Sequence, residues 1–370
     1  MHVLHVVGAR PNFMKAAPVL RAIAAHSGVR QTIVHTGQHY DAAMSEVFFE
    51  QLEMPKPDFN LGVGSGSHAQ QTAGVMLALE PVLLERKPDL VLVYGDVNST
   101  VAAALVCSQR GVRIAHVEAG LRSRDRSMPE EINRLLTDQL SDLLFTPSAD
   151  GDENLLHEGV SAGKIFLVGN VMIDTLVRLL PRSADHFSAG VTSPYTLVTL
   201  HRPSNVDDLP WLRELLTVLV DLSAQLNVVF PVHPRTRQRL DALGSTHKIG
   251  PRLRLMEPLP YLEFLALQRC AAMVITDSGG IQEETTFLGV PCLTVRENTE
   301  RPITLTMGTN QLVGRDLRRL RAAAAEILGR ASRSPDASAP EKNLVPLWDG
   351  HAAERIAHVI VRGTGPSTRG

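Results

Sequence analysis

Short runs of apolar residues alternate with longer amphipathic stretches along the whole chain, and this alternation restricts the fold more than any single motif does. Most of the runs are apolar at every position. Such runs are typical of parallel strands in a sheet that helices cover on both faces. We therefore expect strands at 3–7, 32–35, 90–94, 114–117, 143–145, 165–168, 196–200, 227–232, 253–256, 272–276, 292–295 and 311–313, and helices at 14–25, 68–86, 100–109, 130–141, 209–225, 260–269 and 315–329.

The chain has 370 residues, which is enough for two domains that each bury a core of their own. The alternation breaks between 181 and 194, where small and polar residues replace the apolar runs, and we interpret this stretch as part of the interdomain region. The predicted fold is α/β, with two Rossmann-like doubly wound domains at 1–175 and 176–349 that face a central cleft.

Composition argues against several classes of partner. A net charge of -2 and an aromatic content of 4% do not favour binding to nucleic acid, and no apolar run is long enough to cross a membrane. Cys107, Cys270 and Cys292 form neither a metal-binding spacing nor a disulfide framework, which favours a reducing, cytoplasmic location. Motifs for zinc and calcium are also absent from the sequence, so we expect no metal and no other cofactor.

Polar residues follow several of the expected strands at the point where each strand ends. Ligands of doubly wound sheets bind at these carboxyl ends, so side chains placed there are candidates for function. Their recurrence is a stronger indication than any one of them alone. The residues are Arg10 after 3–7, Asp96 after 90–94, Glu118 after 114–117, His201 after 196–200 and Ser278 after 272–276.

The stretch 276–284 predicts a tight corner between a strand and a helix. Gly279 and Gly280 let the chain turn sharply, so the first N–H groups of the helix can bind an anion. Glu283 and Glu284, one turn later, could accept hydrogen bonds from ribose hydroxyls. Phosphate donors beside ribose acceptors indicate a nucleotide, although an ordinary strand-to-helix corner would explain the two glycines equally well.

The segment 8–15 lies where a Rossmann-like domain places its phosphate loop. It contains one glycine, so it is not the dinucleotide-binding fingerprint. Arg10 offers a forked donor to a diphosphate, and Lys15 lies near the start of the expected helix. Cations there oppose the helix dipole, so a bound anion would rationalise them, whereas a surface ion pair is the alternative.

Two of the strand-end residues have competing explanations. Asp96 is either a catalytic group or the N-cap of the next helix, for which Asn98, Ser99 and Thr100 are rival caps. His201 is either a buried or rim histidine, or an acid that stabilises a departing anion. The sequence leaves both questions open.

Carboxylates are concentrated around the fourth expected strand, 114–117. Glu118 follows this strand, two residues before Gly120, and is a plausible acid or base. Pro129, Glu130 and Glu131 make a good helix start, with proline in the first position and acids in the first turn. A helix start explains a carboxylate at 130 or 131, but it does not explain Glu118.

Taken together, these segments resemble the non-hydrolysing UDP-N-acetylglucosamine 2-epimerases, which share the two-domain glycosyltransferase-B architecture. The resemblance extends from Gly8 to about Gly314 and follows the order of motifs in the family. The matching motifs are 8–11 (Gly-Ala-Arg-Pro), 95–96 (Gly-Asp), 116–122 (His-Val-Glu-Ala-Gly-Leu-Arg), 129–134 (Pro-Glu-Glu-Ile-Asn-Arg), 201–202 (His-Arg), 276–284 and 299–302 (Thr-Glu-Arg-Pro).

The resemblance implies reversible 2-epimerisation of UDP-N-acetylglucosamine to UDP-N-acetylmannosamine in a homodimer, by elimination of UDP to a 2-acetamidoglucal and re-addition. Inversion at carbon 2 needs proton-handling groups on both faces of the sugar, and hence several carboxylates. By resemblance, Asp96, Glu118, Glu130 and His201 are catalytic, and Arg10, Lys15, Leu259, Phe264, Ser278, Gly279, Gly280, Glu284 and Arg301 bind the UDP-sugar. We expect Asp96 or Glu118 to be the base and Glu130 its partner.

The chain departs from the family pattern at two places. It has Gln-His-Tyr-Asp at 38–41 and His-Arg-Pro-Ser at 201–204, where many bacterial members have Gln-His-Arg-Glu and His-Arg-Arg-Glu. In those members the two regions help to bind a second, activating substrate molecule, so allosteric activation is in doubt here. A helix at about 350–362 is expected to pack back on the first domain. The alternatives are a 2-epimerase of another UDP-amino sugar, such as UDP-2,3-diacetamido-glucuronate, a UDP-sugar glycosyltransferase, or a nucleotide-sugar sensor.

Overall fold

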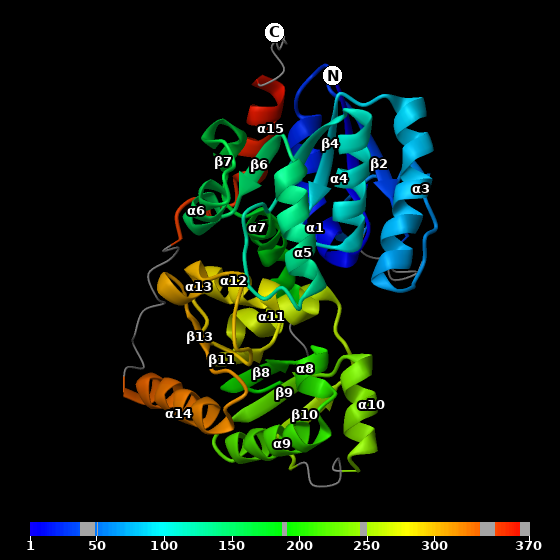
Figure 1. Cartoon of the computed structure of the whole chain (residues 1–370). Coiled ribbons are helices and arrows are strands. Elements are labelled where there is room, and N and C mark those ends of the chain that lie inside the picture. Colours follow the sequence, from blue (N-terminus) through cyan, green and yellow to red (C-terminus); the bar gives the residue numbers. More distant parts are fainter. Residues whose placement is uncertain (38–48, 50, 187–190, 245–249, 334–344, 363–370) are drawn as a thin grey trace. The chain divides into compact units, whose positions relative to one another are not determined.

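The computed structural model describes residues 1–37, 49, 51–186, 191–244, 250–333 and 345–362, apart from the side chains of Arg10 and 331–333. The chain divides into two compact units. An N-terminal unit comprises Met1–Thr175 together with Pro346–Gly370, and a C-terminal unit comprises Leu176–Val345. Each unit contains one sheet of parallel strands with helices against it (Figure 1).

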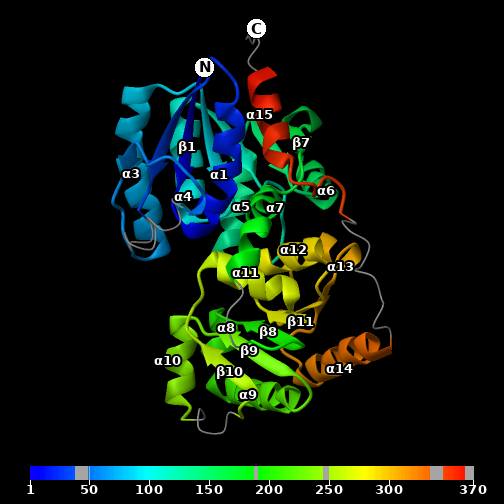
Figure 2. The same ribbon diagram turned by 180° about the vertical axis from the view of Figure 1, so that it is seen from behind.

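The sheet of the N-terminal unit has the strand order β3-β2-β1-β4-β5-β6-β7. Its central strands are buried at every position because helices cover both faces. Helices α3, α4 and α5 lie on the face seen in Figure 1, whereas α1 and α15 pack together on the face seen in Figure 2. The strands are β1 (His2–Val7), β2 (Arg30–His35), β3 (Phe59–Asn60), β4 (Leu90–Tyr94), β5 (Arg113–Val117), β6 (Leu143–Thr146) and β7 (Ile165–Leu167), and the helices are α1 (Arg10–Ala24), α3 (His68–Arg86), α4 (Asn98–Arg110), α5 (Pro129–Leu140), α6 (Ala149–His157), α7 (Val171–Ser183) and α15 (Ala352–Arg362).

The sheet of the C-terminal unit has the order β10-β9-β8-β11-β12-β13. Neighbouring residues of β8 alternate between its two faces, so that Val198 packs under α9 and α14 and Leu197 packs under α11 and α12. The strands are β8 (Tyr195–Thr199), β9 (Asn227–Pro231), β10 (Leu253–Met256), β11 (Met273–Thr276), β12 (Cys292–Thr294) and β13 (Asn310–Leu312), and the helices are α8 (Pro203–Val206), α9 (Leu209–Ser223), α10 (Pro234–Ala242), α11 (Tyr261–Cys270), α12 (Gly279–Leu288), α13 (Ile303–Thr306) and α14 (Leu317–Arg333).

The predicted pair of parallel, doubly wound α/β folds is confirmed, and every expected strand is present within two residues of its expected bounds. The boundary between the units lies inside α7, whose last residues, 181–183, begin the stretch that we interpreted as interdomain. In the described part of the chain, no helix combines the length and the apolar character that a membrane crossing requires.

Candidate functional site

Glu118 lies directly after β5 and forms an ion pair with Lys15 of α1. The side chains of Lys15 and Glu118 are only 7% and 4% exposed. A Cβ atom on Gly95 would lie 2.6 Å from Lys15 Nζ and 3.1 Å from Glu118 Oε2, so the pair is packed against the turn that precedes Asp96. The structure therefore brings two predicted site residues into contact, beside the turn that precedes a third, Asp96. It also gives Lys15 a protein partner, so a bound anion is not needed to explain this charge.

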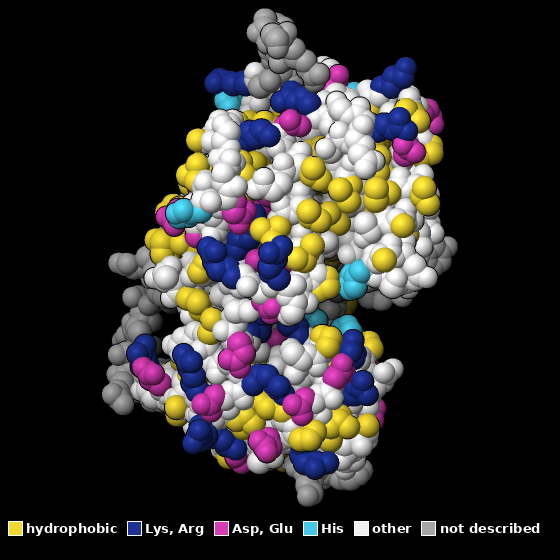
Figure 3. Space-filling model, viewed as in Figure 1, with side chains coloured by type: hydrophobic (Ala, Val, Ile, Leu, Met, Phe, Trp, Pro, Cys, Tyr) yellow, Lys and Arg dark blue, Asp and Glu magenta, His cyan; other side chains and the backbone are white. Residues whose placement is uncertain are grey.

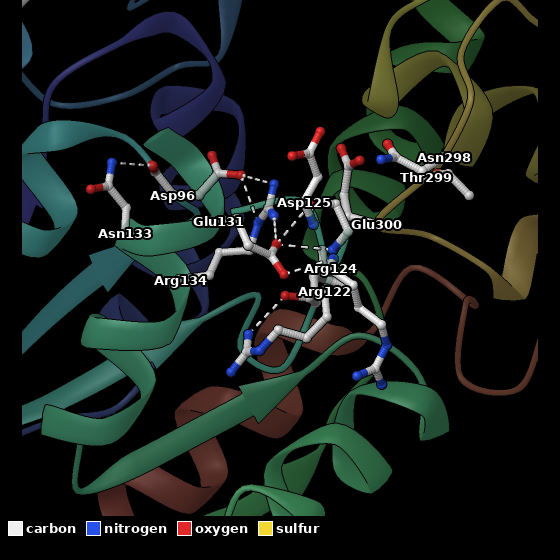
Figure 4. Close-up of polar contacts among 12 residues, drawn as sticks. Asp96, Arg122, Arg124, Asp125, Glu131, Asn133, Arg134, Asn298, Thr299 and Glu300 are labelled. Atoms are coloured by element: carbon white, nitrogen blue, oxygen red, sulfur yellow. Dashed lines mark hydrogen bonds and ion pairs between the residues drawn. The ribbon is translucent and has the colours of Figure 1, made fainter. Parts of the chain in front are cut away.

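Asp96 follows the turn at the end of β4 and is held by α5 (Figure 4). Its Oδ2 atom accepts hydrogen bonds from Arg134 Nε at 3.0 Å and Nη2 at 2.9 Å, and its carbonyl oxygen accepts one from Asn133 Nδ2 at 2.9 Å. The N-cap of α4 is Val97, without a side-chain capping bond, so Asp96 is not the cap of this helix. The guanidinium of Arg134 instead orients the carboxylate of Asp96 and compensates the charge of that carboxylate.

The two glutamates at the start of α5 have different surroundings. Glu131 is buried and accepts hydrogen bonds from the backbone N–H groups of Ser123 and Arg124 at 2.9 and 2.8 Å, and it also pairs with Arg134 (Figure 4). It therefore holds the loop that leads from β5 to α5. Glu130 is partly exposed and makes no hydrogen bond or ion pair with the residues that the structure describes.

The sequence analysis did not identify a network of charged side chains around His116. His116 Nδ1 lies 2.6 Å from Asp138 Oδ1, and Asp138 Oδ2 lies 2.7 Å from Arg122 Nη2. Arg122 in turn pairs with Glu158 at 2.6 Å. Burial alone would raise the pKa of Asp138, but the hydrogen bonds and charges of His116 and Arg122 outweigh it and hold this pKa below its ordinary value.

In the C-terminal unit, α12 begins immediately after β11 with the sequence Ser278-Gly279-Gly280. The N-cap Ser278 makes no side-chain capping bond, so this N-terminus has the character of an anion site. A Cβ atom on Gly279 would lie 2.5 Å from Arg301 Nη1 and 2.7 Å from Glu300 Oε1, whereas one on Gly280 would meet nothing within 4 Å. A side chain at 279 would therefore displace Arg301 or Glu300, whereas one at 280 would not.

The other predicted nucleotide-binding residues lie around this helix. Arg301 is mostly buried, with Nε 2.8 Å from Glu283 Oε1 and Nη1 2.5 Å from Glu300 Oε1. Glu284 Oε1 accepts a hydrogen bond from the Tyr261 hydroxyl at 2.9 Å. The two acids that we expected to act alike therefore differ, because Glu283 pairs with an arginine and Glu284 with a phenol. The predicted uracil contacts, Leu259 and Phe264, are partly buried against the core under α11 and α12.

His201 follows β8 and is oriented by Asp277, another residue that the sequence analysis did not single out. His201 Nδ1 lies 3.1 Å from Asp277 Oδ1, and the imidazole is 43% exposed. Asp277 is buried and also accepts hydrogen bonds from the backbone N–H of Arg202 and from Asn205 Nδ2. Burial would raise the pKa of Asp277, but His201 and these donors outweigh it and lower the pKa. Nε2 is then the nitrogen of His201 that remains for a ligand.

Two predicted features lie outside the described residues, namely the side chain of Arg10 and the segment 38–41 with His39. The described ranges contain no group of three or more His, Cys, Asp or Glu side chains arranged to hold a metal ion.

Comparisons with known proteins agree with the resemblance seen in the sequence. The model of the UDP-N-acetylglucosamine 2-epimerase family matches residues 21–361. A UDP-N-acetylglucosamine 2-epimerase of Methanococcus maripaludis is 44% identical over 366 residues, which are 96% of this chain and 97% of that protein. A UDP-2,3-diacetamido-2,3-dideoxy-D-glucuronate 2-epimerase of Pseudomonas aeruginosa is 41% identical over 98% of this chain and 100% of that protein.

The similarity to solved structures indicates the same family. The Methanocaldococcus jannaschii UDP-GlcNAc 2-epimerase, crystallised in complex with UDP-GlcNAc and UDP, matches with a TM-score of 0.88 and 40% identity, over 98% of this chain and 100% of that one. The chain therefore belongs to the UDP-N-acetylglucosamine 2-epimerase family.

Proposed function

We propose that this protein interconverts UDP-N-acetylglucosamine and UDP-N-acetylmannosamine by eliminating UDP and adding it back. Full-length relatives with this activity in their names are 41% and 44% identical to the chain. The observation that carries the proposal is the pair Asp96 and Glu118, which end neighbouring strands and are each bonded to a cation, Arg134 and Lys15.

The reaction explains why such residues are needed. The hydrogen on carbon 2 is not acidic, because no carbonyl group lies beside it. When the bond from carbon 1 to the diphosphate oxygen breaks, its electrons leave with UDP and positive charge develops at carbon 1. A base then removes the carbon 2 proton, and the C–H electrons form the double bond of a 2-acetamidoglucal. Re-addition of UDP, with a proton delivered to the opposite face of carbon 2, gives the epimer.

We assign the sugar chemistry to the N-terminal unit. Asp96 or Glu118 is the base, each in contact with a cation, and partly exposed Glu130 serves the opposite face. Lys15 and Arg10 complete the set as cations that favour departure of the diphosphate. Asp96 and Glu118 each contact a cation, whereas Glu130 contacts none among the described residues, so the three carboxylates differ in their surroundings.

We assign UDP to the C-terminal unit. The first N–H groups of α12, at Gly279 and Gly280, bind the diphosphate together with the N-cap residue Ser278, and His201 stabilises it as it leaves. The remaining assignments are Glu284 to the ribose hydroxyls, Arg301 to the diphosphate side of the nucleotide, and Leu259 and Phe264 to the uracil.

Exchange with solvent tests the mechanism directly. In deuterium oxide, purified enzyme turning over UDP-N-acetylglucosamine should incorporate deuterium at carbon 2, which proton NMR of the sugar detects. Glu118→Gln should abolish both exchange and epimerisation while UDP still binds. Turnover without exchange would exclude the elimination and favour a glycosyltransferase, and tight UDP binding without turnover in the wild type would favour a sensor.

A second substrate is supported by the Pseudomonas aeruginosa relative, whose name specifies a diacetamido-glucuronate sugar and whose whole length is matched at 41% identity. The same NMR assay run with each UDP-sugar decides between them. A higher kcat/KM for the diacetamido-glucuronate would replace the proposed substrate and leave the elimination mechanism in place.

We also propose that the protein acts as a homodimer through the outer face of α3, α4 and α5. Leu77 and Leu84 of α3 and Leu136 of α5 are 75%, 53% and 45% exposed, and Figure 3 shows apolar side chains gathered over this helix layer. Leu77→Asp should convert dimer to monomer in light scattering, and Leu156→Asp, at an exposed leucine on α6, is the matched control. An unchanged mass for Leu77→Asp would exclude this face.

The cysteines support a cytoplasmic location. Cys107, Cys270 and Cys292 are all free thiols, and burial raises the pKa of Cys107 to about 12 and that of Cys292 to about 11, so both are unreactive. Cell fractionation should recover the protein with cytoplasmic markers, and its presence in an oxidising compartment would contradict this assignment.

A further inference from the structure

His116 has an unusual set of hydrogen-bond partners for a fully buried histidine. It lies on β5 with no exposed surface, and its two ring nitrogens contact two acceptors. Nδ1 lies 2.6 Å from a carboxylate oxygen of Asp138, and Nε2 lies 2.8 Å from the carbonyl oxygen of Gly95. A carbonyl oxygen and an ionised carboxylate can only accept, so both ring nitrogens must donate. The side chain is therefore an imidazolium.

The surrounding charges are consistent with a cation at this position. The network contains the buried Asp138 and Arg122 and the partly exposed Glu158, so a neutral imidazole would leave it with one excess negative charge. With His116 charged, two cations balance two anions. Burial would lower the pKa of Arg122, but Glu158 and Asp138 outweigh it and raise the pKa, so this guanidinium stays charged as well.

The network holds the two turns that bear Asp96 and Glu118. His116 donates to the carbonyl of Gly95, which immediately precedes Asp96. Through Asp138 it is linked to the N–H of Gly120, two residues after Glu118, which donates to Asp138 Oδ2 at 3.1 Å. One imidazolium thus connects the ends of β4 and β5. Without the Nε2 donor, the buried Gly95 carbonyl would lose this hydrogen bond.

We infer that His116, which donates from both ring nitrogens, is a positioning residue that sets the spacing of Asp96 and Glu118 for the elimination step. The inference rests on the proposed function, because it concerns the geometry of those two carboxylates. A misplacement of about 1 Å in a catalytic constellation can lower the rate by about 100-fold. Loss of His116 should therefore lower kcat with little change in KM or in UDP affinity, since our assignment places UDP on the C-terminal unit.

The charge state can be measured without any substrate. In protein labelled with nitrogen-15 in its histidines, the His116 signals are identified by their loss in His116→Gln. Both ring nitrogens should be protonated at neutral pH, because each faces an acceptor. One unprotonated ring nitrogen at neutral pH would overturn the imidazolium, whatever the activity of the enzyme.

Variants test the positioning role, with His5 as the matched control. His5 is also fully buried on a central strand, but it hydrogen-bonds Tyr94 and Gln31, and burial lowers its pKa to about 3, so it is neutral. His116→Met, which has no donor, should lower kcat by about 100-fold, and His116→Gln, which keeps one donor, should recover part of the loss. His5→Met and His5→Gln should retain kcat.

Two results would overturn the positioning role. One is an equal fall of kcat in the His116 and His5 variants at matched thermal stability, and the other is a loss of UDP affinity as large as the loss of kcat. Failure of the proposed function is distinguishable, because the wild-type enzyme would then show no deuterium exchange at carbon 2 with either UDP-sugar.

Discussion

Replacing Lys15 by methionine removes one member of a buried ion pair and leaves the carboxylate of Glu118 without its cation. Both side chains are less than a tenth exposed, and Glu118 has a φ of 75°, so the backbone holds its side chain in place at some cost. Methionine has nearly the same length as lysine, so the change is electrostatic more than steric.

The magnitude follows from the burial of the pair. Two unit charges about 4 Å apart attract by about 4 kcal/mol at an effective dielectric constant of about 20. Breaking a buried pair by removing one partner costs about 3–5 kcal/mol, because a charge is left uncompensated. We expect Lys15→Met to lower the free energy of unfolding of the N-terminal unit by about 3–5 kcal/mol, and Lys15→Met with Glu118→Gln to recover most of this loss.

The two tryptophans make the measurement specific to one unit. Trp348 is buried in the N-terminal unit and Trp211 lies in the C-terminal unit, so in a Trp211→Phe background the fluorescence change during urea unfolding reports the N-terminal unit. Arg110→Met is the control, because the side chains of Arg110 and its partner Glu80 are 43% and 41% exposed and an exposed pair contributes at most about 1 kcal/mol. A cost for Lys15→Met no greater than that of the control would refute the reasoning.

Three further outcomes are expected. Burial raises the pKa of Asp174 from 3.8 to about 6, so between these pH values the folded state keeps a proton that the unfolded state loses. The free energy of unfolding should therefore fall by about 3 kcal/mol as the pH rises through this window. Asp174→Asn should remove this fall, which urea unfolding at the lower and the upper pH of the window measures. Gly279→Ala should weaken UDP binding more than Gly280→Ala in calorimetry, because its methyl group meets Arg301, and equal losses would contradict the packing argument. Gly120→Ala should lower the melting temperature, because φ is 80° and the new Cβ would lie 2.4 Å from a backbone oxygen; an unchanged value would count against this geometry.

The fold was predictable because its signal is local and repeated. Each central strand is apolar along its whole length, as in Leu90–Tyr94, so burial on both faces can be inferred from consecutive residues. The two-residue strand Phe59–Asn60 and the four-residue helix Ile303–Thr306 are too short to show a period, and the sequence analysis missed them.

The candidate site was only partly predictable. Asp96 and Glu118 could be predicted because they follow the ends of expected strands. The sequence could not show that Val97, and not Asp96, is the N-cap of α4. The sequence alone does not distinguish the roles of the adjacent acids Glu130 and Glu131. Helix geometry turns their side chains about 100° apart, so that only Glu131 faces the loop it holds.

The two parallel α/β units, the family, and the strand ends and glycine corners that carry the candidate site could all be inferred from the residues alone, because they depend on residues close together in the chain. The pairing of the charges could be seen only in the folded chain. Lys15 and Glu118 are 103 residues apart, and Arg134 is 38 residues from Asp96. The free energy of a charge depends on what it contacts and how far it is from water, and for these residues both are set by segments that meet only when the chain folds.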